Sequence, residues 1–194
     1  MKTKHAFKYA ALLLLLFTTL NSCSSDNGDG GSSGDIDYYI RYEVNGTLIE
    51  FLFNGDNHID NAYGNFNLID SGNNIASIAA GRHEIGNDES LLLSIRNPSE
   101  IQINTTYSNY MSATTTQPEV LLFTYLDTGG TSFGTFNEDD LTNLYPAAVA
   151  NAKILFSEVT TTYMKGTFSG RFYNSNDNYI EITNGEFKVI RSDL

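Results

Sequence analysis

The segment Asn54–Asn61 carries the densest group of side chains that could hold a metal ion. Asp56, Asn57, Asp60 and Asn61 offer carboxylate and amide oxygens, the hard ligands of which calcium takes about six to eight. Their spacing does not match the calcium loop of an EF-hand. Asp, Asn and Gly also build ordinary turns, because their side chains hydrogen-bond to their own backbone. We favour the turn and keep calcium as the alternative.

Residues for hydrolytic catalysis are sparse. Beyond Cys23 the histidines are His58 and His83, and a triad needs one of them beside an activated Ser and an acid. The acidic run Asn137–Asp140 cannot straddle a sugar, because the two carboxylates of a glycosidase stand about 5–10 Å apart on opposite sides of the bond. We expect a non-enzymatic protein, with an envelope hydrolase as the less favoured alternative.

The tyrosines could form a binding surface rather than a catalytic site. The chain has 12 Tyr, 12 Phe and no Trp. Tyr39, Tyr125, Tyr163 and Tyr179 are predicted on strand faces opposite the more apolar ones, where their amphipathic rings could form a platform for a glycan. The alternative, which we favour, is that these rings pack a second sheet or cover an open sheet face.

Cys23 is the only cysteine, and its surroundings predict a lipid attachment. Lys2, Lys4 and Lys8 precede an apolar run, and Leu20-Asn21-Ser22-Cys23 closes it. The run is shorter than the roughly 20 apolar residues that span a bilayer and has the layout of a removable signal. The tetrapeptide resembles the lipobox of bacterial lipoproteins. That resemblance implies a diacylated thiol, cleavage before Cys23 and an acylated new N-terminus.

The charge of the chain excludes one class of partner. Its formal net charge is −12, and loss of the signal removes three lysines and no acidic residue. A nucleic-acid surface needs clustered Lys and Arg, so we expect no nucleic-acid partner. The lipobox resemblance implies an outer-membrane lipoprotein, facing the periplasm or the cell surface, with the lipid as its membrane contact and an envelope protein or a glycan as a possible partner.

Composition divides the chain into three parts. Residues 1–22 form the predicted signal peptide. Residues 23–35 comprise the lipidated cysteine and a Gly/Ser/Asp-rich tether, which behaves as a flexible coil. Residues 36–194 have the length of one domain, and we expect a single all-β domain there.

Two Asn-Gly dipeptides, the strongest short hairpin signal, support this fold class. Asn45-Gly46 is predicted to turn one strand back onto Thr47–Phe53, with Arg41 opposite Glu50 and Tyr42 opposite Ile49. Asn184-Gly185 is predicted to turn Tyr179–Thr183 back onto Glu186–Ile190 in the same way.

Strand signals rich in Thr, Tyr, Phe, Ile and Val fill the region between these hairpins. The predicted strands are Ile75–Arg82, Ser90–Arg96, Ile101–Tyr107, Glu119–Asp127, Ala152–Val159 and Thr162–Tyr173. A short helix is predicted within Asn137–Ala150, where Pro146 limits its length. Many short strands predict a mostly antiparallel β-sandwich or, alternatively, an open β-barrel.

The C-terminal part resembles a family of small uncharacterised lipoproteins of Bacteroidota. The residues that carry the likeness are Ala152-Lys-Ile-Leu-Phe, Met164-Lys-Gly-Thr-Phe-Ser-Gly, Tyr179-Ile-Glu-Ile-Thr-Asn-Gly-Glu-Phe-Lys-Val and, near the start, Tyr42-Glu-Val-Asn-Gly. The resemblance implies an all-β envelope domain and brings no catalytic residues. We therefore expect a lipid-anchored protein with a binding or structural β-domain, and a glycan-binding accessory protein as the alternative.

Overall fold

A computed structural model gives the fold and describes residues 38–53, 60–84, 87–110, 112–135 and 151–193. These residues belong to one folded unit, Gly34–Leu194, and among them no helix is long and apolar enough to cross a membrane. The described residues form eleven strands. They are β1 (Tyr38–Val44), β2 (Thr47–Phe53), β3 (Asp60–Asp70), β4 (Asn73–Glu84), β5 (Asn87–Asn97), β6 (Thr106–Ser108), β7 (Val120–Leu126), β8 (Ser132–Gly134), β9 (Lys153–Val159), β10 (Tyr163–Tyr173) and β11 (Tyr179–Arg191).

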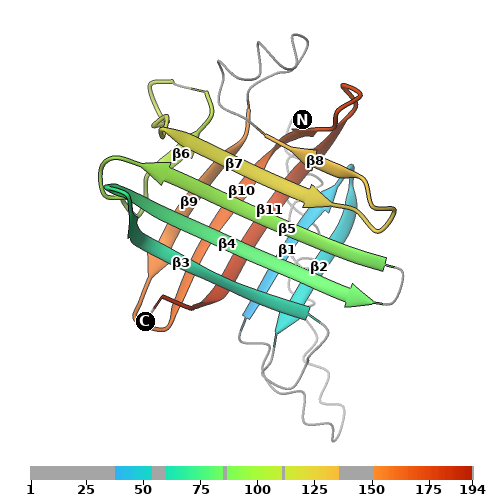
Figure 1. The fold of residues 1–194 in the computed structure, drawn as a ribbon, viewed down its shortest axis with the longest axis horizontal. Helices are drawn as coiled ribbons and strands as arrows, with labels where there is room; N and C mark the ends of the chain where they lie inside the picture. The colour runs from blue at the N-terminus through green and yellow to red at the C-terminus, as the bar shows by residue number, and fades with distance from the viewer. Residues whose placement is uncertain (1–37, 54–59, 85–86, 111, 136–150, 194) are drawn as a thin grey trace, which may run out of the picture. The chain divides into compact units, whose positions relative to one another are not determined.

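The strands form two layers (Figure 1). One layer, the six-stranded sheet, has the order β2-β1-β11-β10-β9-β6, and the other, the five-stranded sheet, has the order β3-β4-β5-β7-β8. Every strand pair is antiparallel except β11–β3, which joins the layers at Ile190 and Tyr63. A second junction pairs Tyr173 of β10 with Gly134 of β8. The expected all-β, mostly antiparallel sandwich is confirmed.

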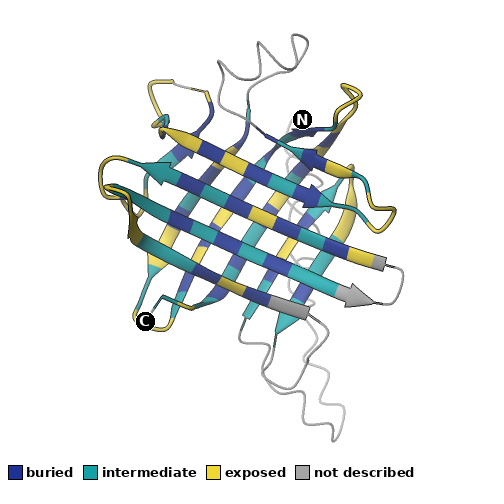
Figure 2. Ribbon diagram, in the orientation of Figure 1, coloured by how far each residue is buried: buried dark blue, intermediate teal, exposed yellow. Residues whose placement is uncertain are grey.

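The core lies between the two sheets and is rich in aromatic rings. Alternation along each strand sends every second side chain inward, and Figure 2 shows buried and exposed residues alternating along β7. Phe156 stands edge-on to both Phe66 and Phe187, with centroids 5.1 and 5.7 Å away. Each buried ring of this size contributes about 1.5–3 kcal/mol through burial. The largest fully buried side chains are Tyr42, Phe51, Phe123, Phe156, Phe172, Phe187, Ile40, Ile78, Leu91, Leu93, Ile95 and Ile101.

The first predicted hairpin is confirmed in turn and register. Asn45 and Gly46 have φ of 50° and 84°, the pair of positive values that a type I′ turn requires. Tyr42 pairs with Ile49 and Arg41 with Glu50, as expected. Both partners of each pair therefore share one face of the sheet.

The second predicted hairpin is wrong, because β11 runs through Asn184-Gly185 as a single strand. Asn184 has φ of 53°, and the registers with β1 and β10 shift at this point. The dipeptide thus forms a bulge, which uses the same left-handed conformation as a turn. Gly185 fits because a Cβ there would lie 2.4 Å from the carbonyl oxygen of Phe168.

The other strand predictions are confirmed in outline, with one largely wrong and two strands missed. In the predicted strand Ile101–Tyr107, pairing begins only at Thr106, because the backbone N–H of Ile101 donates instead to Oδ1 of Asn67 at 2.7 Å. The missed strands are β3 and β8. In β3 the pairing is interrupted beside Asn67, whose φ is 55°. The helix predicted within Asn137–Ala150 lies outside the described residues.

Candidate functional site

The outer face of the six-stranded sheet carries one continuous row of side chains. Strand registers place these residues next to one another across all six strands: Glu50, Arg41, Glu186, Thr167, Leu155 and Thr106. At about 4.8 Å between strands, the row is roughly 24 Å wide. Its chemistry changes from charged at β2, β1 and β11 to hydroxyl-bearing and apolar at β10, β9 and β6.

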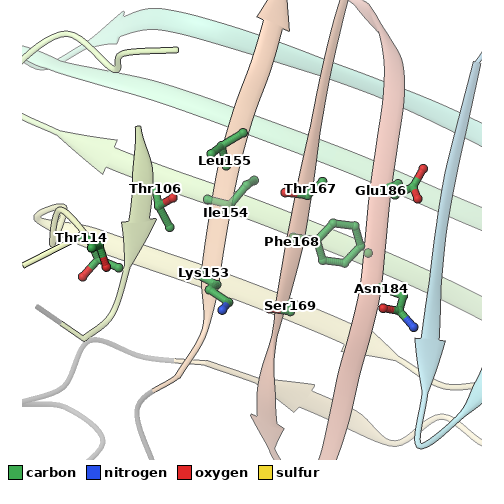
Figure 3. Close-up of a pocket in the computed structure, with 12 residues that line it drawn as sticks. Thr106, Thr114, Lys153, Ile154, Leu155, Thr167, Phe168, Ser169, Asn184 and Glu186 are labelled. Atoms are coloured by element: carbon green, nitrogen blue, oxygen red, sulfur yellow. The ribbon is translucent and has the colours of Figure 1, made fainter. Parts of the chain in front are cut away.

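A hollow of about 660 Å³ lies at the hydroxyl-bearing end of this row. Figure 3 shows Thr106, Leu155, Thr167 and Glu186 arranged across β6, β9, β10 and β11. Small side chains explain the depression, since Thr167 and Ser169 are the outward residues of β10 at this point. The complete lining is Thr106, Thr114, Thr115, Lys153, Ile154, Leu155, Thr167, Phe168, Ser169, Asn184, Gly185 and Glu186.

The hydroxyl groups of the hollow differ in how they are held. Oγ1 of Thr115 donates to the carbonyl of Tyr110 at 2.8 Å and accepts from the N–H of Ser112 at 2.9 Å. Within the described part of the chain, no hydrogen bond engages the hydroxyls of Thr106 and Thr167. They are therefore available to a ligand, and each can both donate and accept.

The two charged residues of the lining stand on different strands. Lys153 is exposed on β9. Glu186 on β11 accepts a hydrogen bond from Nη2 of Arg41 at 2.9 Å, and this bond raises the pKa of the Arg41 guanidinium. Asn184, the bulge residue beside Glu186, donates from Nδ2 to Oε1 of Glu43 at 3.1 Å. The β11 side of the hollow is thus held in place by β1.

Three of the four tyrosines predicted on polar strand faces lie on this same outer face, and each ring has a cation over it. The Arg41 guanidinium lies 4.8 Å from the Tyr39 ring centroid, and that of Arg171 lies 4.9 Å from Tyr179. Nζ of Lys188 lies 5.0 Å from the centroid of Tyr163. Such contacts fix the rings in orientation.

For the fourth tyrosine, Tyr125, the prediction is wrong. Its side chain is only 4 % exposed and lies between the sheets. Its hydroxyl donates to Oε1 of Glu89 at 2.7 Å, and Nη1 of Arg82 lies 3.7 Å from Oε2 of the same carboxylate. Burial raises the pKa of Tyr125, and the bond to Glu89 adds to the rise. The Tyr42 ring meets Tyr125 edge-on at 6.1 Å. Sequence patterns missed this cluster, because the predicted strand Ser90–Arg96 leaves out Glu89, which the structure places within β5.

The residues predicted to do chemistry fall mostly outside the described part of the chain. Asp56, Asn57 and His58 lie outside it, as do Cys23 and Asn137–Asp140. Asp60 and Asn61 begin β3, where their backbones pair with Arg82 and Gly81. Among the described residues, no three His, Cys, Asp or Glu side chains are grouped to hold a metal ion. Calcium binding at Asp56, Asn57, Asp60 and Asn61 therefore stays a prediction.

His83 lies within β4, where its backbone pairs with Asp88 of β5.

Comparison of the chain with models of protein families, with curated proteins and with solved structures finds no match.

Proposed function

We propose that this chain is a lipid-anchored protein of the cell envelope whose β-domain binds a partner, without catalysis, through the outer face of the six-stranded sheet. The observation that carries the binding role is the hydroxyl-lined hollow of about 660 Å³ on that face. Its size falls within the roughly 300–1,000 Å³ that is usual for ligand pockets.

The anchoring part of the proposal rests on Cys23 and its surroundings. Acylation of the thiol and of the new N-terminus would supply more than one chain, which stable anchoring requires. The Gly/Ser/Asp tether of residues 24–35 would then let the domain sample neighbouring molecules at high effective concentration. The lipobox argues for the outer membrane as its location, on either the periplasmic or the external side.

The binding part rests on the chemistry of the lining. The hollow combines five hydroxyl side chains with Leu155, Lys153, Glu186 and Asn184, and among the described residues no histidine or cysteine lines it. Hydroxyls that can both donate and accept recognise polar ligands by hydrogen bonding. A nucleophilic reaction would need one of these hydroxyls to be activated by an adjacent base, and Glu186 is already engaged by Arg41.

A glycan is the second candidate, and a specific observation favours it. Tyr39, Tyr163 and Tyr179 lie on the same sheet face as the hollow. Tyr179 is 51 % exposed. Aromatic rings that share a sheet face with hydroxyl groups open to a ligand match the alternating apolar and hydroxyl faces of a sugar. In that case the protein would be an accessory that holds a glycan at the membrane.

The anchoring is tested by mass spectrometry of the mature N-terminus and by membrane fractionation. The wild-type chain should carry acyl groups on Cys23 and sediment with membranes. The Cys23→Ala variant should lose both properties. A Cys23→Ala chain that remains membrane-bound would contradict the lipid anchor.

The binding is tested by covalent cross-linking in native membranes followed by purification. Thr167→Arg fills the hollow, whereas Thr47→Arg makes the same change on β2, in the same sheet but away from the hollow. We expect wild type and Thr47→Arg to give similar yields of the cross-linked partner or glycan. The yield from Thr167→Arg should be at least tenfold lower. Equal yields from all three chains would exclude the hollow as the binding site.

A further inference from the structure

The lysines of the domain differ from its arginines in how they are paired. Every arginine forms an ion pair with a carboxylate: Arg41, Arg82, Arg96, Arg171 and Arg191. Beyond residue 22 the lysines are Lys153, Lys165 and Lys188, and within the described residues none of them forms such a pair. Three cations without a carboxylate partner need an explanation in a chain whose formal net charge is −12.

Two of these lysines lie together on the outer face of the six-stranded sheet. Lys165 of β10 and Lys188 of β11 are direct cross-strand partners. The next outward pair along the same two strands is Thr167 and Glu186, which line the hollow. The lysine pair therefore adjoins the hollow, two residues or roughly 7 Å along the strands from its lining.

Lys153 stands at another side of the hollow. It lines the hollow from β9 and pairs with Ser169 of β10, and Figure 3 shows it well away from Glu186. Ser169 is four residues along β10 from Lys165, which is roughly 13 Å at about 3.3 Å per residue. Cations thus border the hydroxyl-lined hollow on two sides.

Neighbouring acidic residues are engaged by groups other than the lysine pair. Glu158 faces Lys165 from β9, but its Oε1 accepts a hydrogen bond from the Tyr163 hydroxyl at 2.7 Å. Glu186 forms its ion pair with Arg41. Like charges directly opposite each other destabilise a sheet, so the two facing lysines are held together at a cost that a bound anion would relieve.

Aromatic rings hold Lys188 in place. Its Nζ lies 5.0 Å from the ring centroid of Tyr163 and 5.5 Å from that of Tyr38. Cation–π contacts of this kind restrict the side chain while leaving its charge. An anion that binds there meets an ammonium group that is already oriented, so less rotamer freedom is lost on binding.

We propose that this face binds an acidic glycan, a saccharide chain bearing carboxylate or phosphate groups, with one acidic group at Lys165 and Lys188 and another at Lys153. The inference rests on the binding function proposed above and names the class of its ligand. The lysines would form charge-assisted hydrogen bonds with the acidic groups, and the hydroxyls of the hollow would bond to those of the sugar.

The arrangement favours a glycan over a membrane surface. A flat array of lipid headgroups could contact the lysines, but it could not enter the hollow between them. The acidic residues elsewhere on the chain repel an anionic ligand only weakly, because the screening length at physiological ionic strength is about 8 Å.

The binding test uses the full-length chain in a neutral detergent and two forms of one polymer. Polygalacturonate carries a carboxylate on each sugar, and its methyl ester has the same backbone without the charge. Biolayer interferometry gives the dissociation constants. We expect the wild type to bind polygalacturonate at least tenfold more tightly than the ester, with an affinity that falls as the salt concentration rises.

Variants separate the lysines from a general effect of charge. The double variant Lys165→Gln, Lys188→Gln should raise the dissociation constant for polygalacturonate at least tenfold, and Lys153→Gln should raise it severalfold. Arg96→Gln, which removes a positive charge from the outer face of the other sheet, should leave it within twofold of the wild type. The double variant should melt at or above the wild-type temperature, because it removes a contact between like charges. Its loss of binding would then not come from unfolding.

Three outcomes would overturn the proposal. One is a wild-type chain that fails to bind polygalacturonate, or binds its ester equally well. Another is a double variant that binds as tightly as Arg96→Gln. The third is protection of Lys165 and Lys188 from acetylation, read by mass spectrometry, when phosphatidylglycerol is added to the micelles but not when polygalacturonate is added. That result would assign the pair to lipid headgroups. In each case, a partner that Thr167→Arg loses in native membranes would leave the proposed binding function standing and exclude only the acidic glycan.

Discussion

At the scale of single residues, the buried carboxylate of Glu89 is the most demanding feature of the domain. Its side chain is 5 % exposed, and a buried charge is costly unless partners satisfy it. Tyr125 supplies a short hydrogen bond and Arg82 supplies a nearby positive charge. Tyr42, which contacts the same ring, is fully buried, and within the described residues its hydroxyl has no hydrogen-bond partner.

Two Tyr→Phe changes in this cluster should therefore act in opposite directions. Tyr125→Phe removes a partner of the carboxylate and should lower the free energy of unfolding by about 1.5–3 kcal/mol. Tyr42→Phe removes an unsatisfied hydroxyl and should leave stability unchanged or raise it by about 1 kcal/mol. Urea denaturation of both variants measures the difference. Equal losses would show that the Tyr42 hydroxyl is satisfied in the folded protein.

A second residue pair ties the end of β11 to both layers. Nε and Nη2 of Arg191 donate to the Asp193 carboxylate at 3.1 and 2.6 Å, and Nη1 of Arg191 donates to the carbonyl of Thr160 at 2.9 Å. The backbone N–H of Phe66, on β3, donates to the same carboxylate at 3.4 Å. The hydrogen bond from Arg191 lowers the pKa of Asp193 below its ordinary 3.8, against the opposing effect of burial.

This lowered pKa predicts how stability depends on pH. The stabilisation is complete above the ordinary carboxyl value of 3.8 and is lost as the pH falls through the lower, folded value. At neutral pH, Asp193→Asn should cost about 1–2 kcal/mol, and the gap to wild type should narrow below about pH 4. Urea midpoints at pH 7 and pH 3 check this, with the exposed Asp177→Asn as control. A gap that is constant with pH would refute the charge-based account.

At the scale of elements, the bulge at Asn184-Gly185 fixes how β11 packs between β1 and β10. A Cβ on Gly185 would lie 2.4 Å from the Phe168 carbonyl oxygen and 2.8 Å from its ring. The ring could move, but the backbone oxygen is held in the sheet. The bulge therefore depends on a missing side chain as much as on the left-handed conformation of Asn184.

Gly185→Ala should accordingly lower the free energy of unfolding by about 1–3 kcal/mol, the usual cost of overpacking. Gly81→Ala is the matched control, because the nearest atoms to a Cβ there lie 3.9 Å away. Thermal melting of the two variants gives the comparison. If Gly185→Ala and Gly81→Ala have the same melting temperature, the close approach to Phe168 is relieved without loss of stability.

The two Asn-Gly dipeptides show what the sequence can and cannot predict about the fold. At Asn45-Gly46 the turn, the alternation and the pairing of Arg41 with Glu50 agree, and all three are local. At Asn184-Gly185 the same local signals are present, but β1 and β10 already occupy both edges of β11. Which strands flank β11 is decided by long-range pairing. Local sequence patterns carry no information about which strands become neighbours.

The candidate site could not be predicted from the sequence for the same reason. Alternation along β10 puts Thr167 and Ser169 on its outward face. The hollow exists only because β6, β9, β10 and β11 stand side by side, and Thr106 and Glu186 are eighty residues apart in the sequence. The predicted face of Tyr125 was wrong for a different reason. Its strand was correctly predicted, but the inward face of that strand was assigned to the wrong set of residues.

At the scale of the whole molecule, the two outer faces of the sandwich differ in their chemistry. The face of the six-stranded sheet carries a hydroxyl-lined hollow, together with paired charges and tyrosines that have cations over their rings. The face of the five-stranded sheet carries leucine, valine and small polar residues, with the exposed Asp70 and Asp88 toward the ends of its strands. A lipid on Cys23, as proposed, would hold the hollow at the membrane surface, where the tether gives it a high effective concentration of neighbouring ligands.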